Sequence, residues 1–317
     1  MSRKTVPIFF AVDDNYAPYL AVCINSIIKN CDKNRKYEIK ILNDKVNEKN
    51  KCAIADLATT NVSIEFFTIE KGLEAITDDI SNRLRFDQFT LTIYYRLFIP
   101  TIFKEYDKAI YIDCDVIINT DLGKLFDIEI GDNYIGACND LSVADVPVLV
   151  DYMENVVGVK GSKYINSGVL LMNLEKLRES NLDKHFLSLL QEYHFDSVAP
   201  DQDYINALCE GKIYYLDSHW NTMPNENKPP IQNPYLIHYN LYSKPWCGYS
   251  QYADYFWNYA KESVFYEEIL NFKNMYTEEL RKADKEKMKV LINRAANILK
   301  NEITFRKIEE KGVRIKL

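Results

Sequence analysis

Apolar positions in the first 70 residues alternate between short continuous runs and helix-spaced patterns. Residues 6–12, 37–42 and 62–67 carry runs or alternations that predict three strands. Between them, residues 19–28 and 45–59 repeat apolar side chains at helical spacing, which predicts two helices. This β-α-β-α-β order predicts a parallel sheet with helices on its faces.

The same reading extends to the rest of the chain. It predicts strands at 108–112, 134–138 and 168–173, and helices at 89–103, at 201–208 and from Leu174 onward. Prolines interrupt the pattern between 224 and 234, and after Trp246 the chain becomes aromatic and then helical. We therefore expect one α/β domain with a mostly parallel central sheet at residues 1–250, and a C-terminal helical, basic extension at 251–317.

Charge is distributed unevenly along the 317 residues. The formal net charge is -7, yet residues 276–317 carry 12 Lys+Arg and 7 Asp+Glu, so the rest of the chain is at -12. An acidic body argues against a nucleic-acid groove. The basic tail, mixed with apolar residues, fits either peripheral contact with an anionic membrane or packing on its own body or on a second subunit.

Several classes of protein are disfavoured by what the sequence lacks. It has no G-x-G-x-x-G, no G-x-x-x-x-G-K and no G-x-S-x-G, the motifs of dinucleotide-binding, P-loop and nucleophile-elbow enzymes. No apolar run reaches the roughly 18 residues of a transmembrane helix. The first apolar run meets Asp13 and Asp14 before any small-residue cleavage site, so we do not expect a signal peptide. Seven scattered cysteines without C-x-x-C favour a reducing compartment, hence a cytoplasmic location, with the inner face of the membrane as an option.

Asp113-Cys114-Asp115 is the strongest candidate for metal chemistry. It directly follows the strand predicted at 108–112, and ligands of open α/β sheets collect at the carboxyl ends of strands. Residues i and i+2 of a strand share a face, so both carboxylates can bind one Mg²⁺ or Mn²⁺. His238, after another short apolar run, would favour Mn²⁺, and Lys244 could contact a phosphate as a point charge. Taken singly, the tripeptide is readily explained by a structural role, and a lone histidine after a strand is more often a structural hydrogen-bonding residue.

Other polar residues suit a nucleotide sugar. Asp13 and Asn15 close the first predicted strand, where they would either read a base or ribose or form an Asx turn. Asn166, Asp201 and Gln202 offer amide and carboxylate groups suited to sugar hydroxyls, although each alone is uninformative.

Together these pieces resemble glycosyltransferase family 8, the glycogenin-like and lipopolysaccharide galactosyltransferase-like enzymes. The motifs that carry the resemblance follow in order as FAVDDNY at 10–16, YYRL at 94–97, KAIYIDCD at 108–115, YINSGVLL at 164–171, DQD at 201–203 with Asn206, and HY at 238–239 with KPW at 244–246. The resemblance implies a nucleotide-diphosphosugar transferase domain of the GT-A type, which is Rossmann-like.

The resemblance also implies roles for individual residues. Uridine and ribose would be held by Asp13 and Asn15, and Mn²⁺, with Mg²⁺ as the alternative, by Asp113, Asp115 and His238. The diphosphate would meet Lys244. The donor sugar would be surrounded by Arg96, Asn166, Asp201, Gln202 and Asp140.

The implied reaction is transfer of glucose or galactose from a UDP-sugar with retention of configuration. Acceptors would be glycans, glycolipids or glycoproteins of cell-surface polysaccharide or lipopolysaccharide-like synthesis. Gln202 lies where a nucleophile is expected, and an amide is a poor one, so we favour front-face internal return over a covalent intermediate on Asp201 or Asp140. Leu241 replaces a family glycine, so a non-catalytic nucleotide-sugar binding protein is one alternative. A metal-dependent nucleotidyltransferase is the other, because it also places carboxylates on a metal beside a nucleotide, although the sequence shows no basic or glycine-rich triphosphate loop.

Overall fold

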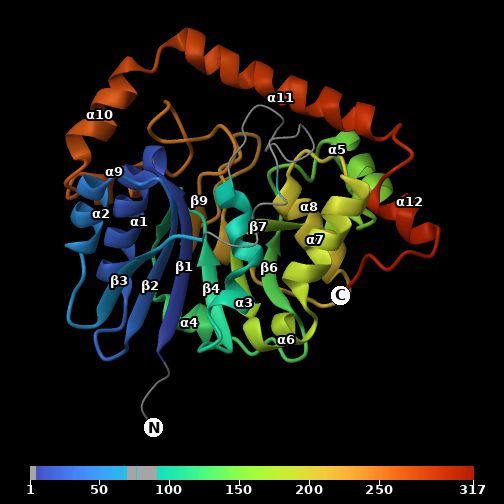
Figure 1. Cartoon of the computed structure of the whole chain (residues 1–317). Coiled ribbons are helices and arrows are strands. Elements are labelled where there is room, and N and C mark those ends of the chain that lie inside the picture. The colour runs from blue at the N-terminus through green and yellow to red at the C-terminus, as the bar shows by residue number, and fades with distance from the viewer. Residues whose placement is uncertain (1–4, 70–75, 77–90) are drawn as a thin grey trace.

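The computed structural model describes residues 5–69, 76 and 91–317, and its centre is a twisted sheet covered by helices on both faces (Figure 1). Among the described residues the sheet has seven strands in the order β3-β2-β1-β4-β7-β6-β8. Their bounds are β1 Val6–Asp13, β2 Tyr37–Asp44, β3 Val62–Phe67, β4 Lys108–Ile112, β6 Ile135–Asn139, β7 Ile165–Asn173 and β8 Ile213–Tyr215.

Helices and single turns connect these strands and cover the sheet. The α-helices before residue 250 are α1 Ala17–Asn30, α2 Glu48–Ala55, α3 Ile99–Ile102, α4 Leu122–Phe126, α5 Pro147–Tyr152, α6 Leu174–Glu179, α7 Leu182–Tyr193 and α8 Pro200–Cys209. The 3₁₀-helical segments are η1 Asp14–Tyr16, η3 Leu91–Leu97, η5 Gly161–Lys163 and η6 Ser218–Asn221, and η4 Met153–Val157 is a π-helical turn.

The first half of the sheet is parallel, as the sequence predicts. Strand β1 pairs with β2 along its whole length and with β4 on its other side, and β2 pairs with β3. Alternate side chains of β1 enter opposite layers of the core: Phe9 packs on one face, and Ile8 and Phe10 pack on the other. Burial on both faces explains why this strand is a continuous apolar run.

Strand β7 runs antiparallel between β4 and β6, and this reversal builds the functional edge. Ile112, the last residue of β4, pairs with Val169, and the N–H of Asp113 donates to the carbonyl of Gly168 at 2.8 Å. The amino end of β7 therefore lies beside the carboxyl end of β4. A parallel β7 would place its carboxyl end there instead.

A second, two-stranded sheet brings a distant segment to the same edge. Strand β5 (Val116–Ile118) pairs antiparallel with β9 (Leu236–His238), and Val116 lies opposite His238. His238 is thereby placed next to Asp115, although the two are far apart in the sequence.

The helix predicted at 89–103 is wrong as one continuous element. Residues 89 and 90 lie outside the described residues, and the remainder divides into η3 and the short helix α3. Pro100 explains the division, because it lacks the N–H that would continue an α-helical ladder from η3. The helix predicted at 45–59 is also shorter than expected, at Glu48–Ala55.

The C-terminal helices α9 (Ala253–Ala260), α10 (Tyr266–Met275), α11 (Glu278–Ile298) and α12 (Phe305–Glu310) pack against the α/β body. Phe256 and Ile269 join one core layer, whereas Ile298 and Phe305 join the other. Helix α11 spans the top of the molecule between α10 and α12 (Figure 1). The described helices include none that is both long and apolar enough to cross a membrane.

Candidate active site

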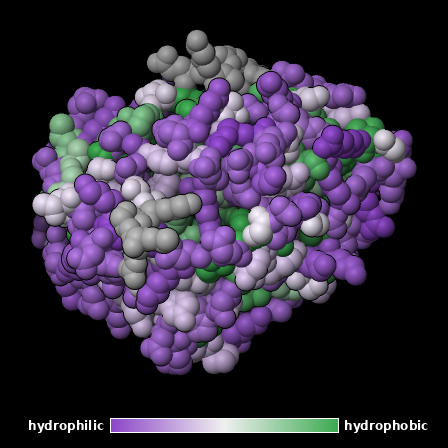
Figure 2. Space-filling model, turned by 90° about the horizontal axis from the view of Figure 1, so that it is seen from below, coloured by the Kyte–Doolittle hydropathy of each residue, from purple (hydrophilic) through white to green (hydrophobic). Residues whose placement is uncertain are grey.

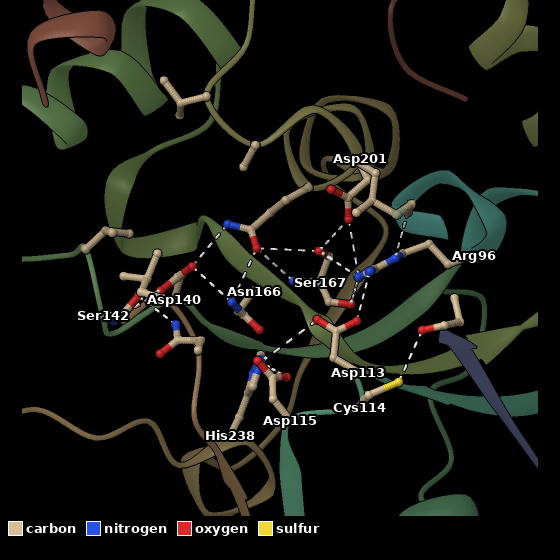
Figure 3. Close-up of a pocket in the computed structure, with 18 of the residues that line it drawn as sticks. Arg96, Asp113, Cys114, Asp115, Asp140, Ser142, Asn166, Ser167, Asp201 and His238 are labelled. Carbon is tan, nitrogen blue, oxygen red and sulfur yellow. Dashed lines mark hydrogen bonds and ion pairs between the residues drawn. The ribbon is translucent and has the colours of Figure 1, made fainter. Parts of the chain in front are cut away.

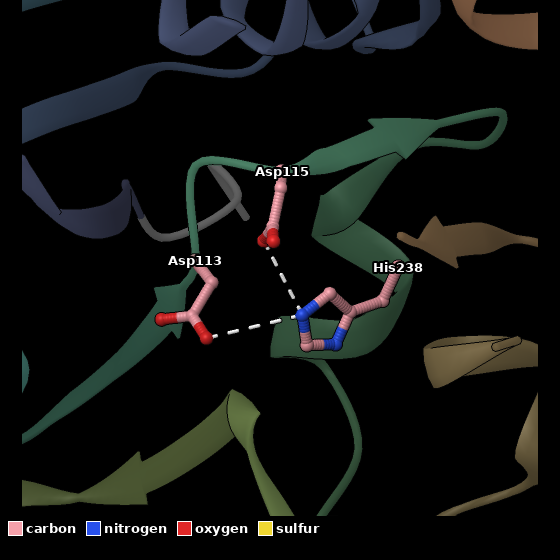
Figure 4. Close-up of side chains that lie close together, drawn as sticks. All are labelled: Asp113, Asp115 and His238. Atoms are coloured by element: carbon pink, nitrogen blue, oxygen red, sulfur yellow. Dashed lines mark ion pairs between the residues drawn. The ribbon is translucent and has the colours of Figure 1, made fainter. Parts of the chain in front are cut away.

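Asp113, Asp115 and His238 meet at the carboxyl end of β4, as the sequence predicts (Figure 4). One ligand atom from each lies within 4.8 Å of the others. His238 Nε2 is 3.3 Å from Asp115 Oδ1 and 3.9 Å from Asp113 Oδ2. Two carboxylate oxygens and one imidazole nitrogen form a donor set that suits a divalent cation such as Mn²⁺ or Mg²⁺.

Gly168 forms the floor of this cluster. A Cβ atom there would lie 2.3 Å from His238 Cε1 and 2.7 Å from Asp113 Oδ2. Both distances are far below van der Waals contact, so the two ligand side chains can converge only over a residue without a side chain. The residues present therefore fit a metal site both in donor chemistry and in shape.

Lys244 forms an ion pair with Asp115. Its ammonium group donates to the Asp115 carboxylate and to the carbonyl of Tyr239. Burial alone would raise the pKa of Asp115, but the nearby Lys244 and His238 outweigh it and hold that pKa below its usual value. Asp115 is therefore an ionised acceptor at neutral pH.

Arg96 links the acidic cluster to the next group of side chains (Figure 3). Its guanidinium donates to Asp113 Oδ1 at 2.9 Å and forms an ion pair with Asp201 at 3.3 Å. Ser167 Oγ also donates to Asp201, at 3.0 Å. Burial raises the pKa of Asp201, and the positive charge of Arg96 opposes that rise.

Asp201 and Asp203 diverge, unlike Asp113 and Asp115. They lie on helix α8, where residues i and i+2 point to different sides. Asp203 accepts hydrogen bonds from Tyr152, Tyr164 and Ser197 in the core. The second D-x-D of the sequence is thus one site residue and one core residue.

Asn166, Gln202 and Asp140 form an amide-rich corner beside the cluster. Gln202 Nε2 donates to Asp140 Oδ2 at 3.0 Å, and its Oε1 accepts from the N–H of Ser167 at 3.1 Å. Asn166 Nδ2 donates to the same Asp140 oxygen at 3.1 Å. Such paired donors and acceptors match the hydroxyl groups of a sugar.

Asp13 and Asn15 separate at the end of β1. Asp13 lines the same cavity as the metal cluster and accepts a hydrogen bond from the N–H of Tyr16 at 3.1 Å, the Asx-type turn noted as an alternative. Asn15 is exposed and lines an adjoining groove, not the cavity itself. Of the sequence-predicted site residues, Asn15 is the one that the structure leaves outside the cavity.

The cavity has a volume of about 260 Å³ and is lined by both polar and apolar side chains. The polar ones include those of the acidic cluster, Arg96 and the amide corner. The apolar ones, called here the apolar wall, are Ile93, Val143, Leu149, Met153, Val198 and Leu291. Leu291 belongs to α11, so the C-terminal segment contributes directly to the site.

Leu241 adopts a backbone conformation that glycine accepts more readily than leucine. Its φ is 51°, in the left-handed region that leucine rarely adopts. Lys244, three residues later, still reaches Asp115. Leucine at position 241 is therefore compatible with Lys244 at the acidic cluster, and it adds an apolar side chain to the lining of the cavity.

Sequence reasoning missed several residues of the site. Tyr111 donates to Asp113, Ser167 bridges Arg96 and Asp201, and Asn221 connects Asn166 to His238. Tyr111 and Ser167 fall inside motifs noted above, so their positions gave a usable signal. Asn221 lies between two motifs and gave none.

Comparison with known proteins decides the family. The sequence model of glycosyl transferase family 8 matches residues 7–249. The chain belongs to glycosyl transferase family 8. The resemblance inferred from the motifs is confirmed, and so is the GT-A-like α/β fold.

Three family 8 comparisons show how far the similarity reaches. A putative glycosyltransferase of Haemophilus influenzae is 35% identical over 70% of this chain, and the match spans 65% of that protein's length. A lipopolysaccharide 1,2-glucosyltransferase of Escherichia coli is 26% identical over 81% of this chain and 78% of its own. The solved galactosyltransferase LgtC, in complex with donor and acceptor sugar analogs, has a TM-score of 0.64 and 25% identity over 87% of this chain and 99% of that chain.

Proposed function

We propose that this family 8 protein is a metal-dependent retaining hexosyltransferase that transfers glucose or galactose from a UDP-sugar to a glycan, glycolipid or glycoprotein. The observation that carries the proposal is the convergence of Asp113, Asp115 and His238 beside a hydroxyl-binding corner in one cavity. The names of its relatives, a lipopolysaccharide glucosyltransferase and a galactosyltransferase, support the choice of hexose and of cell-surface acceptors. We assign the transferase to residues 1–250 and the role of an extension to 251–317.

The roles follow from the contacts of each group. Asp113, Asp115 and His238 would hold Mn²⁺, with Mg²⁺ as the alternative, and such a cation when bound stabilises negative charge on a departing diphosphate. Lys244 would contact the diphosphate, and Asp13 would bind the nucleoside together with Asn15 from the adjoining groove. Asn166, Gln202, Asp140, Asp201 and Arg96 orient the hexose through its hydroxyl groups.

The hydrogen bonds of the corner favour internal return over a covalent intermediate. The Gln202 side chain already accepts a hydrogen bond through its oxygen and donates one through its nitrogen. Asp201 is buried against Arg96 and Ser167. Asp140 accepts hydrogen bonds through both of its oxygens. We infer that the leaving phosphate removes the proton of the acceptor hydroxyl on the same face as it departs. A glycosyl adduct trapped on Asp201 or Asp140 would contradict this path.

The test is release of UDP from a panel of UDP-sugars with Mn²⁺, Mg²⁺ or EDTA. We expect turnover with UDP-glucose or UDP-galactose, dependence on the metal, and a loss of about 10³-fold in Asp113→Ala, because that change removes a metal ligand. Asp132→Ala, an exposed carboxylate away from the site, is the matched control. UDP binding without turnover would favour the non-catalytic binding protein, and pyrophosphate release from UTP would favour the nucleotidyltransferase.

We propose that any membrane contact uses the outer face of α11 and not the end of the tail. Phe305, Ile308 and Ile315 are buried in the body and cannot enter a bilayer without unfolding. Helix α11 exposes Lys282, Lys285 and Lys289 at helical spacing, and Lys289 forms an ion pair with the exposed Glu286 at 2.6 Å. The opposite, lower face of the molecule is mostly hydrophilic, with small separate apolar patches in the view of Figure 2.

All seven cysteines are unpaired, which supports a reducing, cytoplasmic location.

Co-sedimentation with anionic vesicles tests this contact. Replacing the three α11 lysines by glutamine should weaken vesicle binding by on the order of 100-fold, because each contributes about 1 kcal/mol near an anionic surface. The control changes three exposed lysines elsewhere, Lys33, Lys124 and Lys212. Equal binding of both triple variants would rule out the α11 face.

A further inference from the structure

Two buried asparagines connect the metal cluster to the sugar-binding corner. His238 Nδ1 is 3.0 Å from Asn221 Oδ1, and Asn221 Nδ2 is 3.0 Å from Asn166 Oδ1. All three side chains are buried, with Asn221 at 1% exposure and His238 at 2%. Asn221 is not among the residues assigned above from the motifs.

Neighbouring groups fix which atom donates and which accepts in each hydrogen bond that links His238, Asn221 and Asn166. The N–H of Gly168 donates to Asn166 Oδ1 at 3.0 Å, and Asn166 Nδ2 donates to the Asp140 carboxylate. The Asn166 oxygen can therefore only accept, so the facing atom of Asn221 is its NH₂ group. The Asn221 oxygen then faces His238, whose Nδ1 must carry a proton.

This protonation leaves Nε2 of His238 as the atom directed at Asp113 and Asp115. Metal-binding histidines usually donate their second N–H to an oxygen that fixes the ring and its tautomer. Here that oxygen belongs to an asparagine whose other end is held by a sugar-site residue. The same side chain thus contacts both halves of the site.

We propose that Asn221 is a positioning residue that directs His238 Nε2 toward the divalent cation and couples this ligand to Asn166 in the hexose site. The inference rests on the proposed function. It predicts that metal affinity and hexose affinity respond separately to the two ends of the Asn221 amide.

If Asn221 had a purely structural role, its removal would disturb the backbone around it. The backbone next to Asn221 is held without its side chain, because the N–H of Thr222 donates to Leu236 and the N–H of His238 donates to Thr222, at 2.9 and 2.8 Å. Trp220 is also buried beside it. Removing the Asn221 amide should therefore leave this segment in place while freeing the His238 ring.

Two substitutions separate the two ends of the amide. Asn221→Ala removes both hydrogen bonds, and we expect Mn²⁺ affinity, measured by electron paramagnetic resonance of the free ion, to fall by about 10- to 100-fold. Asn221→Asp keeps an acceptor for His238 Nδ1 but cannot donate to Asn166. It should bind Mn²⁺ close to the wild-type level and lose affinity for UDP-hexose relative to UDP by about tenfold.

Asn43→Ala is the matched control. Asn43 is also buried, and its side chain donates to the carbonyl of Phe67 at 2.9 Å, away from His238. We expect its Mn²⁺ affinity to equal that of the wild type, and thermal melting of all variants confirms that each is folded. Wild-type Mn²⁺ affinity in folded Asn221→Ala, or equal Mn²⁺ losses in the alanine and aspartate variants, would overturn the positioning role and leave the proposed function standing. Absence of Mn²⁺ binding in the wild type would instead refute the metal site on which both depend.

Discussion

Gly168→Ala is expected to abolish metal binding and to lower turnover by about 10³-fold, as much as removal of a metal ligand. The added methyl group would lie 2.3 Å from the His238 ring and 2.7 Å from an Asp113 oxygen. Neither neighbour can withdraw easily, because the N–H of Asp113 is bonded to Gly168 itself and His238 belongs to strand β9. Calorimetric titration with Mn²⁺, together with the UDP release assay, measures both effects.

Gly136→Ala provides the control for adding a methyl group to a strand of the same sheet. Its Cβ would lie 3.2 Å from Ile130 Cγ2 and 3.4 Å from Leu171 Cβ, so its neighbours would have to shift by only a few tenths of an ångström. Metal affinity in this variant should match the wild type. Tight Mn²⁺ binding by folded Gly168→Ala would mean that the cation does not lie between Asp113 and His238.

Asp203→Ala is expected to lower the free energy of unfolding by about 3 kcal/mol or more, because it leaves three buried hydroxyl groups without an acceptor. Tyr152, Tyr164 and Ser197 all donate to this carboxylate, which is fully buried. Asp203→Asn should cost less, since its remaining oxygen can still accept from part of this set. Urea unfolding followed by tryptophan fluorescence gives the three midpoints.

An exposed carboxylate separates this effect from a loss of charge. Asp132→Ala, at a turn before β6, should leave the urea midpoint nearly unchanged. If Asp203→Ala unfolded at the wild-type midpoint, the hydroxyl cluster around it would not contribute to stability.

Local pattern predicted the strands well and their pairing only in part. Strand β3 and strand β4 have the predicted bounds. The apolar run of β4 is buried on both faces, whereas β3 alternates apolar residues with Ser63 and Glu65. The reversal of β7 and the pairing of β5 with β9 depend on contacts between distant segments, which periodicity does not encode. The prediction of a continuous helix over 89–103 was wrong, because it relied on the apolar spacing and gave too little weight to Pro100.

The site was more predictable from chemistry than from geometry. Asp113, Asp115 and His238 could be identified because metal ligands need particular side chains after particular strands. Asn221 could not, since an asparagine contributes here through a hydrogen bond to another residue, and no spacing rule describes that. Asn15 was placed in the cavity by its motif, whereas the turn η1 directs it into the adjoining groove.

The apolar wall of the cavity has a consequence for mutation. Leu291 belongs to α11, which lies beyond the residues 7–249 matched by the family, whereas the metal ligands lie within them. Mutations at Leu291 can thus change the shape of the cavity in this chain without altering Asp113, Asp115 or His238.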